Sequence, residues 1–93
     1  MAVEVRRNAE NSRYEILLDG QLVGIAEYRA TDESVVFPHT VIEPVLQGRG
    51  LGKQLVRGAL DDVRKSGKTV VARCWFVRQF IDENPAYRDL LAA

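Results

Sequence analysis

Three glycines and two basic residues lie together in residues 47–53, which read Gln-Gly-Arg-Gly-Leu-Gly-Lys. Each glycine inside a helix costs about 1 kcal/mol relative to alanine, so such a cluster is typical of a backbone that a ligand must approach closely. A helix that begins here would direct its unpaired N–H groups and the positive end of its dipole outward, which favours a bound anion. Arg49 and Lys53 add positive charge at the same place. We therefore predict a pyrophosphate-binding turn, and the alternative is a flexible turn that binds nothing.

Two common nucleotide-binding motifs do not match this chain. The dinucleotide-binding pattern requires two residues between its second and third glycines, whereas only Leu51 separates Gly50 from Gly52. Residues 67–69 (Gly-Lys-Thr) are similar to the end of a P-loop, but Asp62 stands where the first glycine of that motif is required. The glycine turn is therefore not expected to serve nucleotide hydrolysis.

The chain has a single cysteine, Cys74, and a single histidine, His39. A thiolate can accept an acyl group, and an imidazole can remove the proton from an amine nucleophile. The alternatives are that Cys74 is a small core residue and that His39 is a half-buried strand residue. Glu43 is a second candidate for the base. One cysteine and one histidine match no zinc-ligand spacing, so we expect no metal site.

The first half of the chain is predicted to form strands, because apolar and polar residues alternate and turn-forming residues separate the alternating runs. These strands are expected at residues 3–7, 14–18, 22–30 and 35–42. Asp19-Gly20 is a strong hairpin signal. Pro38 cannot donate a ladder hydrogen bond, so we expect an edge position or a β-bulge there. Four strands in chain order predict an antiparallel sheet.

The second half is predicted to add a helix and a fifth strand. The helix follows from one apolar stripe formed by Leu51, Leu55, Ala59, Leu60 and Val63. Gly67 is expected to end this helix, and residues 69–75 read as a buried strand. A strand, a helix and a strand in this order make a right-handed crossover with parallel strands. Helical spacing continues at residues 76–81, where Trp75, Phe76 and Phe80 are expected in the core. Asn84 and Pro85 are expected to begin a last short helix, with Leu90 and Leu91 also in the core. The predicted fold class is α+β, a mixed and mostly antiparallel sheet whose fourth and fifth strands are parallel.

Residues 47–52 match the signature Q/R-x-x-G-x-G/A of the GNAT superfamily of acyl-CoA-dependent N-acetyltransferases, and the predicted element order also resembles that fold. The resemblance implies that the turn holds the pyrophosphate of CoA and that the end of the fourth strand pairs with pantetheine. The cofactor-binding residues that it implies are Val41, Ile42, Gln47, Gly48, Arg49, Gly50, Leu51, Gly52 and Lys53. Acetyl-CoA would be the co-substrate and an unidentified amine the acceptor. Cys74 and His39 are the candidate catalytic residues.

The chain is most similar to a compact GNAT-like subfamily with a His-Thr pair before the glycine turn, a cysteine on the fifth strand and an Asn/His-Pro-x-Tyr motif. His39-Thr40, Cys74 and residues 84–87 match these features. Larger members place two helices between the first two strands to shape the acceptor site, whereas only residues 8–12 lie there. Tyr87 also follows Asn84 by only three residues, which is closer than the usual spacing of the tyrosine that protonates the departing CoA thiolate in GNAT enzymes. A non-catalytic acetyl-CoA-binding or sensor module is therefore the alternative function.

Composition limits the remaining possibilities. The 93 residues carry 13 Lys+Arg and 13 Asp+Glu, which gives a formal net charge of zero. This length predicts one domain over residues 1–93, and the resemblance implies that it binds acetyl-CoA. Zero net charge argues against nucleic-acid binding, which depends on a clustered basic excess. A single cysteine forms no intramolecular disulfide, and no apolar run is typical of a signal peptide or a membrane span. We therefore predict a cytoplasmic protein without a membrane partner.

Overall fold

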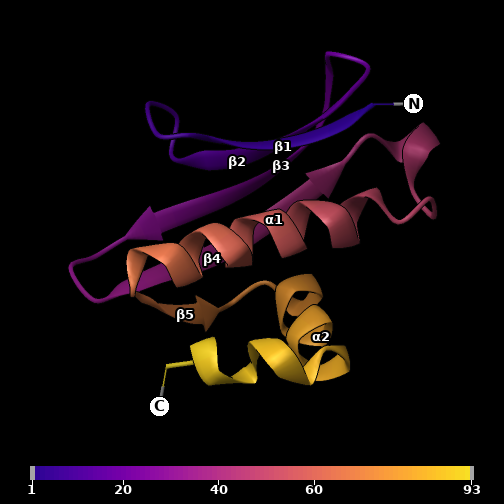
Figure 1. Cartoon of the computed structure of the whole chain (residues 1–93). Coiled ribbons are helices and arrows are strands. Elements are labelled where there is room, and N and C mark those ends of the chain that lie inside the picture. Colours follow the sequence, from indigo (N-terminus) through magenta and orange to yellow (C-terminus); the bar gives the residue numbers. More distant parts are fainter. Residues whose placement is uncertain (1, 93) are drawn as a thin grey trace.

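A computed structural model describes residues 2–92 as a five-stranded sheet with two α-helices packed against one of its faces (Figure 1). The elements in chain order are β1 (Val3–Asn8), β2 (Arg13–Leu18), β3 (Gln21–Ala30), β4 (Ser34–Ile42), η1 (Pro44–Leu46), α1 (Leu51–Ser66), β5 (Thr69–Ala72), α2 (Trp75–Glu83) and η2 (Pro85–Leu90). Both η1 and η2 are short 3-10 helices. The strands lie in the sheet in the same order as in the chain.

The pairing of the strands confirms the predicted mixed sheet. Strands β1 to β4 are antiparallel neighbours, and β5 pairs with β4 in parallel, from Ser34 opposite Thr69 to Phe37 opposite Ala72. Helix α1 connects this parallel pair. The turn between β2 and β3 has the positive φ angles that Asp-Gly favours, 51° at Asp19 and 82° at Gly20. The fold class is therefore α+β, as the sequence predicts.

Pro38 lies at a β-bulge, which was one of its two predicted environments. Glu27 of β3 pairs with His39, and Arg29 pairs with Val36, so Phe37 and Pro38 together oppose the single residue Tyr28. In the sheet, β4 lies between β3 and β5. Its pairing with β5 ends at Phe37, so Pro38 also has the predicted edge position on that side, and its missing N–H falls where neither ladder is regular.

The predicted helix is present, and its apolar stripe packs against the sheet. Leu51, Leu55, Ala59, Leu60 and Val63 are all buried. Burying one large aliphatic side chain contributes about 1.5–3 kcal/mol, so this stripe accounts for much of the attachment of α1 to the sheet. At the end of the helix, Gly67 has a φ angle of 78° and its N–H donates to the carbonyl of Arg64, which confirms the predicted cap.

The region after β5 differs from the prediction. The strand ends at Ala72, three residues before the expected boundary at residue 75, and Cys74 is the N-cap of α2. Trp75 was expected in the core but is 73% exposed, because it occupies the outward-facing first position of α2. Phe76 is half-buried and Phe80 is buried, so the stripe of α2 begins one residue later than predicted.

The last segment agrees with the prediction except at its cap. Leu90 is buried and Leu91 is half-buried against the core, as expected. The final helix is η2, and Asn84 precedes it without a side-chain capping hydrogen bond. The Asn84 amide instead donates backward to the carbonyl of Phe80 at 2.7 Å, which closes the end of α2.

No helix within residues 2–92 is both long enough and apolar enough to cross a membrane.

Candidate active site

A cleft opens where β4 and β5 separate. Their pairing ends at Phe37 and Ala72, and one further hydrogen bond joins the Cys74 N–H to the Phe37 carbonyl at 2.9 Å. Beyond this point β4 continues to Ile42, whereas the chain after β5 turns into α2 (Figure 1). The space between them is a cavity of about 900 Å³, bounded by the second half of β4, the glycine turn, the first turn of α1 and residues 73–76.

The second half of β4 offers backbone groups to this cleft. The Glu43 N–H donates to Val23 of β3, so the alternation along a strand directs the groups of Val41 toward β3 and those of Thr40 and Ile42 toward the cleft. Val41 does not line the cavity, whereas Thr40 and Ile42 do. The Gln47 side chain donates to the Ile42 carbonyl at 3.3 Å. Of the two strand residues predicted to bind the cofactor, Ile42 therefore faces the cleft and Val41 does not.

The glycine turn and the first turn of α1 form the end of the cleft, and every residue from Gln47 to Lys53 lines it. Gly48 and Gly50 have φ angles of 84° and 79°, a conformation that residues with side chains rarely adopt. Gly50 is the N-cap of α1, has no side chain to cap the helix, and is followed by no acidic residue in the first turn. The first helical turn therefore presents unsatisfied N–H groups beside Arg49 and Lys53.

Gly52 is required for a different reason from the other two glycines. A Cβ atom at this position would lie 2.8 Å from the ring of Phe76 in α2. Gly52 thus lets the first turn of α1 pack directly against α2, which closes one side of the cleft. All three glycines were predicted to be places where a ligand approaches, but at Gly52 the neighbour at this distance is an aromatic side chain of the protein itself.

Cys74 lies at the deep end of the cleft. Its side chain is only 9% exposed, and its thiol donates a weak hydrogen bond to the hydroxyl oxygen of Thr40, with 3.6 Å between sulfur and oxygen. Both residues line the cavity. The structure therefore combines the two interpretations of Cys74, since the residue is buried against the core and also borders the cleft. The contact with Thr40 depends on the approach of α2 to β4, so no local sequence signal could predict it.

His39 also borders the cleft, but from the opposite face of the sheet. It is exposed and alternates along β4 with Thr40, which faces α2. Its cross-strand partner is Glu27 of β3, so the two side chains are neighbours on the helix-free face. Glu43, the other candidate base, is exposed and does not line the cavity.

Tyr87 does not belong to the cleft. Its hydroxyl donates to the Asp61 carboxylate of α1 at 2.8 Å, and its ring lies against Phe80. Burial, with Asp61 as a further cause, raises the pKa of the Tyr87 hydroxyl above its usual value. Both observations make Tyr87 part of the packing between η2 and α1. Tyr87 is therefore not in the position expected for the tyrosine that donates a proton in larger GNAT proteins.

Trp75, which was expected in the core, instead lines the cleft.

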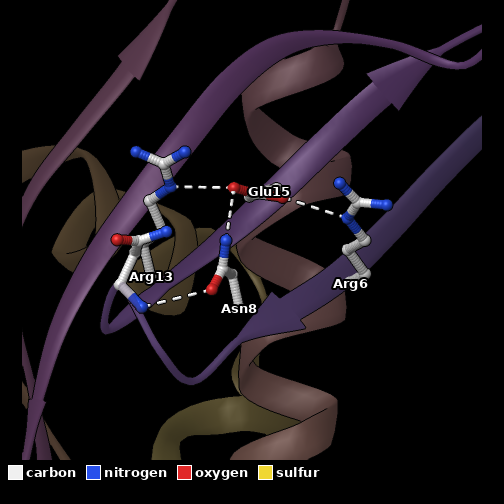
Figure 2. Close-up of polar contacts among 5 residues, drawn as sticks. Arg6, Asn8, Arg13 and Glu15 are labelled. Carbon is white, nitrogen blue, oxygen red and sulfur yellow. Dashed lines mark hydrogen bonds and ion pairs between the residues drawn. The ribbon is translucent and has the colours of Figure 1, made fainter.

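The helix-free face of the sheet carries a buried carboxylate that the sequence analysis did not single out. Glu15 is 2% exposed and accepts hydrogen bonds from Arg13 at 2.8 Å, Arg6 at 3.0 Å and Asn8 at 3.1 Å (Figure 2). The hydrogen bond from Asn8 is the largest cause that lowers the pKa of Glu15, and the two arginines lower it further. Alternating charged residues on β1 and β2 were the only available signal, and they do not reveal burial.

Among residues 2–92, no three His, Cys, Asp or Glu side chains gather closely enough to hold a metal ion.

The fold and the cleft together define the GNAT architecture, in which a glycine turn follows a strand that has separated from its parallel neighbour. A sequence model of GCN5-related N-acetyltransferases matches residues 13–90. The chain belongs to the GCN5-related N-acetyltransferase family.

Solved structures share the fold of this chain, and other known sequences are similar to it. A GCN5-like protein from Staphylococcus aureus, solved in solution by NMR, superposes with a TM-score of 0.72 at 21% identity, covering 97% of this chain and 88% of that one. The ribosomal-protein-S18-alanine N-acetyltransferase of Escherichia coli has a TM-score of 0.63 at 16% identity, covering 71% of this chain but 43% of the enzyme. Among curated sequences, Protein NATD1 from Bos taurus is 28% identical over 86 residues, which are 89% of this chain and 75% of that protein. Protein NATD1 from Xenopus tropicalis is 25% identical over 87 residues, 90% of this chain and 79% of that protein.

Proposed function

We propose that this chain transfers an acetyl group from acetyl-CoA to an amine, with residues 1–93 acting as one acetyl-CoA-binding domain. The observation that carries the proposal is the cleft between β4 and β5, because it combines two features that would bind the donor with one residue that can accept its acetyl group. These are the cleft-facing backbone groups of Thr40 and Ile42, the uncapped start of α1, and the Cys74 thiol at the deep end.

The cofactor would lie along the cleft with its pyrophosphate at the glycine turn. The free N–H groups at the start of α1 would donate to the phosphate oxygens, and Arg49 and Lys53 would balance the negative charge. The amide groups of pantetheine would pair with Thr40 and with the N–H of Ile42, as an added strand pairs with a sheet edge. This arrangement brings the thioester toward Phe37 and Cys74, where the two strands meet.

The transfer itself has two possible routes through this site. In the direct route, the amine nitrogen attacks the thioester carbonyl, the carbon–sulfur bond breaks, and CoA leaves as a thiolate that takes up the proton lost by the amine. In the two-step route, the sulfur of Cys74 attacks the thioester carbonyl, the bond to the CoA sulfur breaks, and CoA leaves with the proton of the thiol. The amine then attacks acetyl-Cys74, the carbon–sulfur bond to Cys74 breaks, and the Cys74 sulfur takes up the proton lost by the amine. His39 and its cross-strand partner Glu27 would accept the proton of the incoming ammonium group in either route.

Titration with CoA and with acetyl-CoA, followed by amide chemical shifts, tests the cofactor site. We expect the largest changes at Gly48, Gly50 and Gly52, and no change at these glycines would contradict the proposal. Release of CoA with an amine panel then tests turnover. Binding of acetyl-CoA without release of CoA across the panel would favour the alternative, a non-catalytic acetyl-CoA-binding or sensor module. The short turn at residues 9–12, which stands in place of acceptor-side helices, supports this alternative.

Cys74→Ala separates the two routes. Full activity in this variant would establish direct transfer. Loss of activity, together with an acetyl group found on Cys74 of the unaltered protein by mass spectrometry, would establish the two-step route. Thr40→Val is the matched control, since it removes the hydroxyl group that contacts the thiol but keeps the thiol itself.

A further inference from the structure

A second recess adjoins the cleft on the helix-free side of the sheet. It has a volume of about 560 Å³ and is formed by residues 11–13, residues 27–30 and Pro38. Pro38 also lines the cleft, so the two spaces meet at the β-bulge of β4. Glu27 lines the recess and its cross-strand partner His39 lines the cleft, which makes this pair the boundary between the two.

The charges of the recess are arranged around Glu27. Arg13 of β2 is the cross-strand partner of Glu27, and Arg29 follows two positions along β3, on the same face. Within residues 2–92, neither Glu27 nor Arg29 has an ion-pair partner. An ammonium group in the recess can therefore pair with the carboxylate of Glu27 on the cleft side. An anionic group can pair with the guanidinium groups of Arg13 and Arg29.

Arg13 is held in place by the buried Glu15. The Nε atom of Arg13 donates to Glu15 at 2.8 Å (Figure 2), and no atom within residues 2–92 accepts a hydrogen bond from the two terminal nitrogens of its guanidinium group. Burying a carboxylate on the open face of a sheet is costly unless hydrogen bonds compensate, and here Arg6, Asn8 and Arg13 all donate to it. The consequence is an arginine with a fixed orientation whose two terminal nitrogens are free to bind an anion in the recess.

We propose that the recess is the acceptor subsite and that the acceptor is a primary amine which also carries a carboxylate or phosphate group. The inference rests on the proposed function and names the class of its second substrate. The anionic group binds Arg13 and Arg29, and the amino group lies at Glu27 and His39, next to Pro38 and the cleft. Glu15 is a positioning residue, since it acts on the substrate only through Arg13.

Four small amines test this proposal because they have similar length and differ in charge. β-Alanine and phosphoethanolamine carry an anionic group, propylamine carries none, and diaminopropane carries a second cation. With acetyl-CoA present, we expect kcat/KM for the two anionic amines to exceed that for propylamine by about tenfold or more, the usual size of a charge-assisted contact. Diaminopropane is expected to be the poorest substrate. The better of the two anionic amines identifies the preferred anion.

Arg29→Gln tests the residue directly, because Arg29 is exposed and its replacement leaves the core unchanged. We expect its KM for the anionic amines to rise about tenfold, with the KM for acetyl-CoA unchanged. Lys65→Gln is the matched control, as it removes one exposed positive charge near the far end of α1 and should alter neither value. Glu15→Gln is expected to raise the same KM with little change in kcat, which a purely structural role of Glu15 would not do.

Equal or better use of propylamine or diaminopropane would overturn the proposal. If none of the four amines is acetylated, amide shifts in the CoA-bound protein decide. Changes at Ser12, Glu27 and Arg29 caused by β-alanine or phosphoethanolamine, but not by propylamine, would support the subsite, and their absence would overturn it. A failure confined to the amines overturns only the acceptor class, whereas a failure of CoA to shift the glycine turn overturns the proposed function.

Discussion

The glycines at the two ends of α1 have the same backbone conformation, but the two ends are capped differently. Gly50 before the helix and Gly67 after it have φ angles of 79° and 78°. At the far end, the Gly67 N–H bonds to the carbonyl of Arg64, the Ser66 hydroxyl donates to the carbonyl of Val63, and Arg64 forms a two-bonded ion pair with Asp89. At the beginning, no side chain caps the helix.

We call the end at Gly67 the closed end, because the protein's own groups bond to it, and the end at Gly50 the open end, because no side chain caps it. Arg64 and Lys65 lie where cations stabilise the negative end of the helix dipole, as is usual. Acidic residues would stabilise the positive end in the same way, yet the first turn has none and Arg49 and Lys53 lie there instead. This positive helix end without a counter-charge of its own is the feature that supports the proposed binding of the CoA pyrophosphate.

The strongest test of the comparison is the same substitution at both ends. Gly50→Glu is expected to weaken acetyl-CoA binding by about a hundredfold or more, because a carboxylate near the phosphates repels them by several kcal/mol at partly screened distances. Gly67→Glu is the matched control, since a Cβ atom meets nothing within 4 Å at either glycine. Left-handed strain should cost both variants about 1–2 kcal/mol, with Gly67→Glu the less stable because its carboxylate lies at the negative end of the helix dipole. Only Gly50→Glu should lose affinity in calorimetric titrations. Equal affinity in the two variants would remove the distinction between the ends.

Acid is expected to destabilise the folded protein through Glu15, which lies away from the glycine turn. The pKa of Glu15 is lowered in the folded protein, so Glu15 contributes stability at pH values above its ordinary pKa of 4.5. This contribution is lost as the pH falls below 4.5 and through the lower pKa of the folded state. We expect Glu15→Gln to lower the free energy of unfolding at neutral pH by about 1–3 kcal/mol, the value of hydrogen bonds to a charged group. Urea unfolding of both proteins measures this.

The variant also provides its own control in acid. The stability difference between Glu15→Gln and the unaltered protein should shrink as the pH falls, since protonation makes the two side chains similar. A difference that stays constant with pH would show that shape, and not charge, makes the native residue important.

Single charges at the open end should have a smaller effect. Arg49→Gln and Lys53→Gln are each expected to weaken acetyl-CoA binding by about tenfold, the value of one charge-assisted contact with phosphate. Rising salt should reduce the difference from the unaltered protein, because both residues are exposed. Lys65→Gln at the closed end is the control. A loss of affinity in this variant as large as in the other two would mean that net charge, and not the location of the charge, governs binding.

Sequence reasoning succeeded where the cause of a structure is local. Gly67 and Asp19-Gly20 favour their turns through their own backbone preferences, and Pro38 disrupts a ladder because it has no N–H. The apolar stripe of α1 likewise depends on residues three and four apart. These signals are sufficient for the order of the elements and for the position of the glycine turn.

The remaining features depend on contacts between distant segments. Trp75 is exposed because β5 ends early, and the Cys74 thiol meets Thr40 because α2 approaches β4. Glu15 is buried by donors from two strands, and the second recess is formed by the turn between β1 and β2 together with β3. No periodicity within one element predicts which side chains of another element will cover it.

The hydrogen bond from the Cys74 N–H to the Phe37 carbonyl has a consequence for how this site can change over evolutionary time. The position of residue 74 is fixed by its main chain, which any residue except proline retains. One nucleotide change exchanges the thiol for the hydroxyl of serine while the frame of the cleft is kept. The reactivity at the deep end of the cleft can thus drift independently of the architecture that holds the donor.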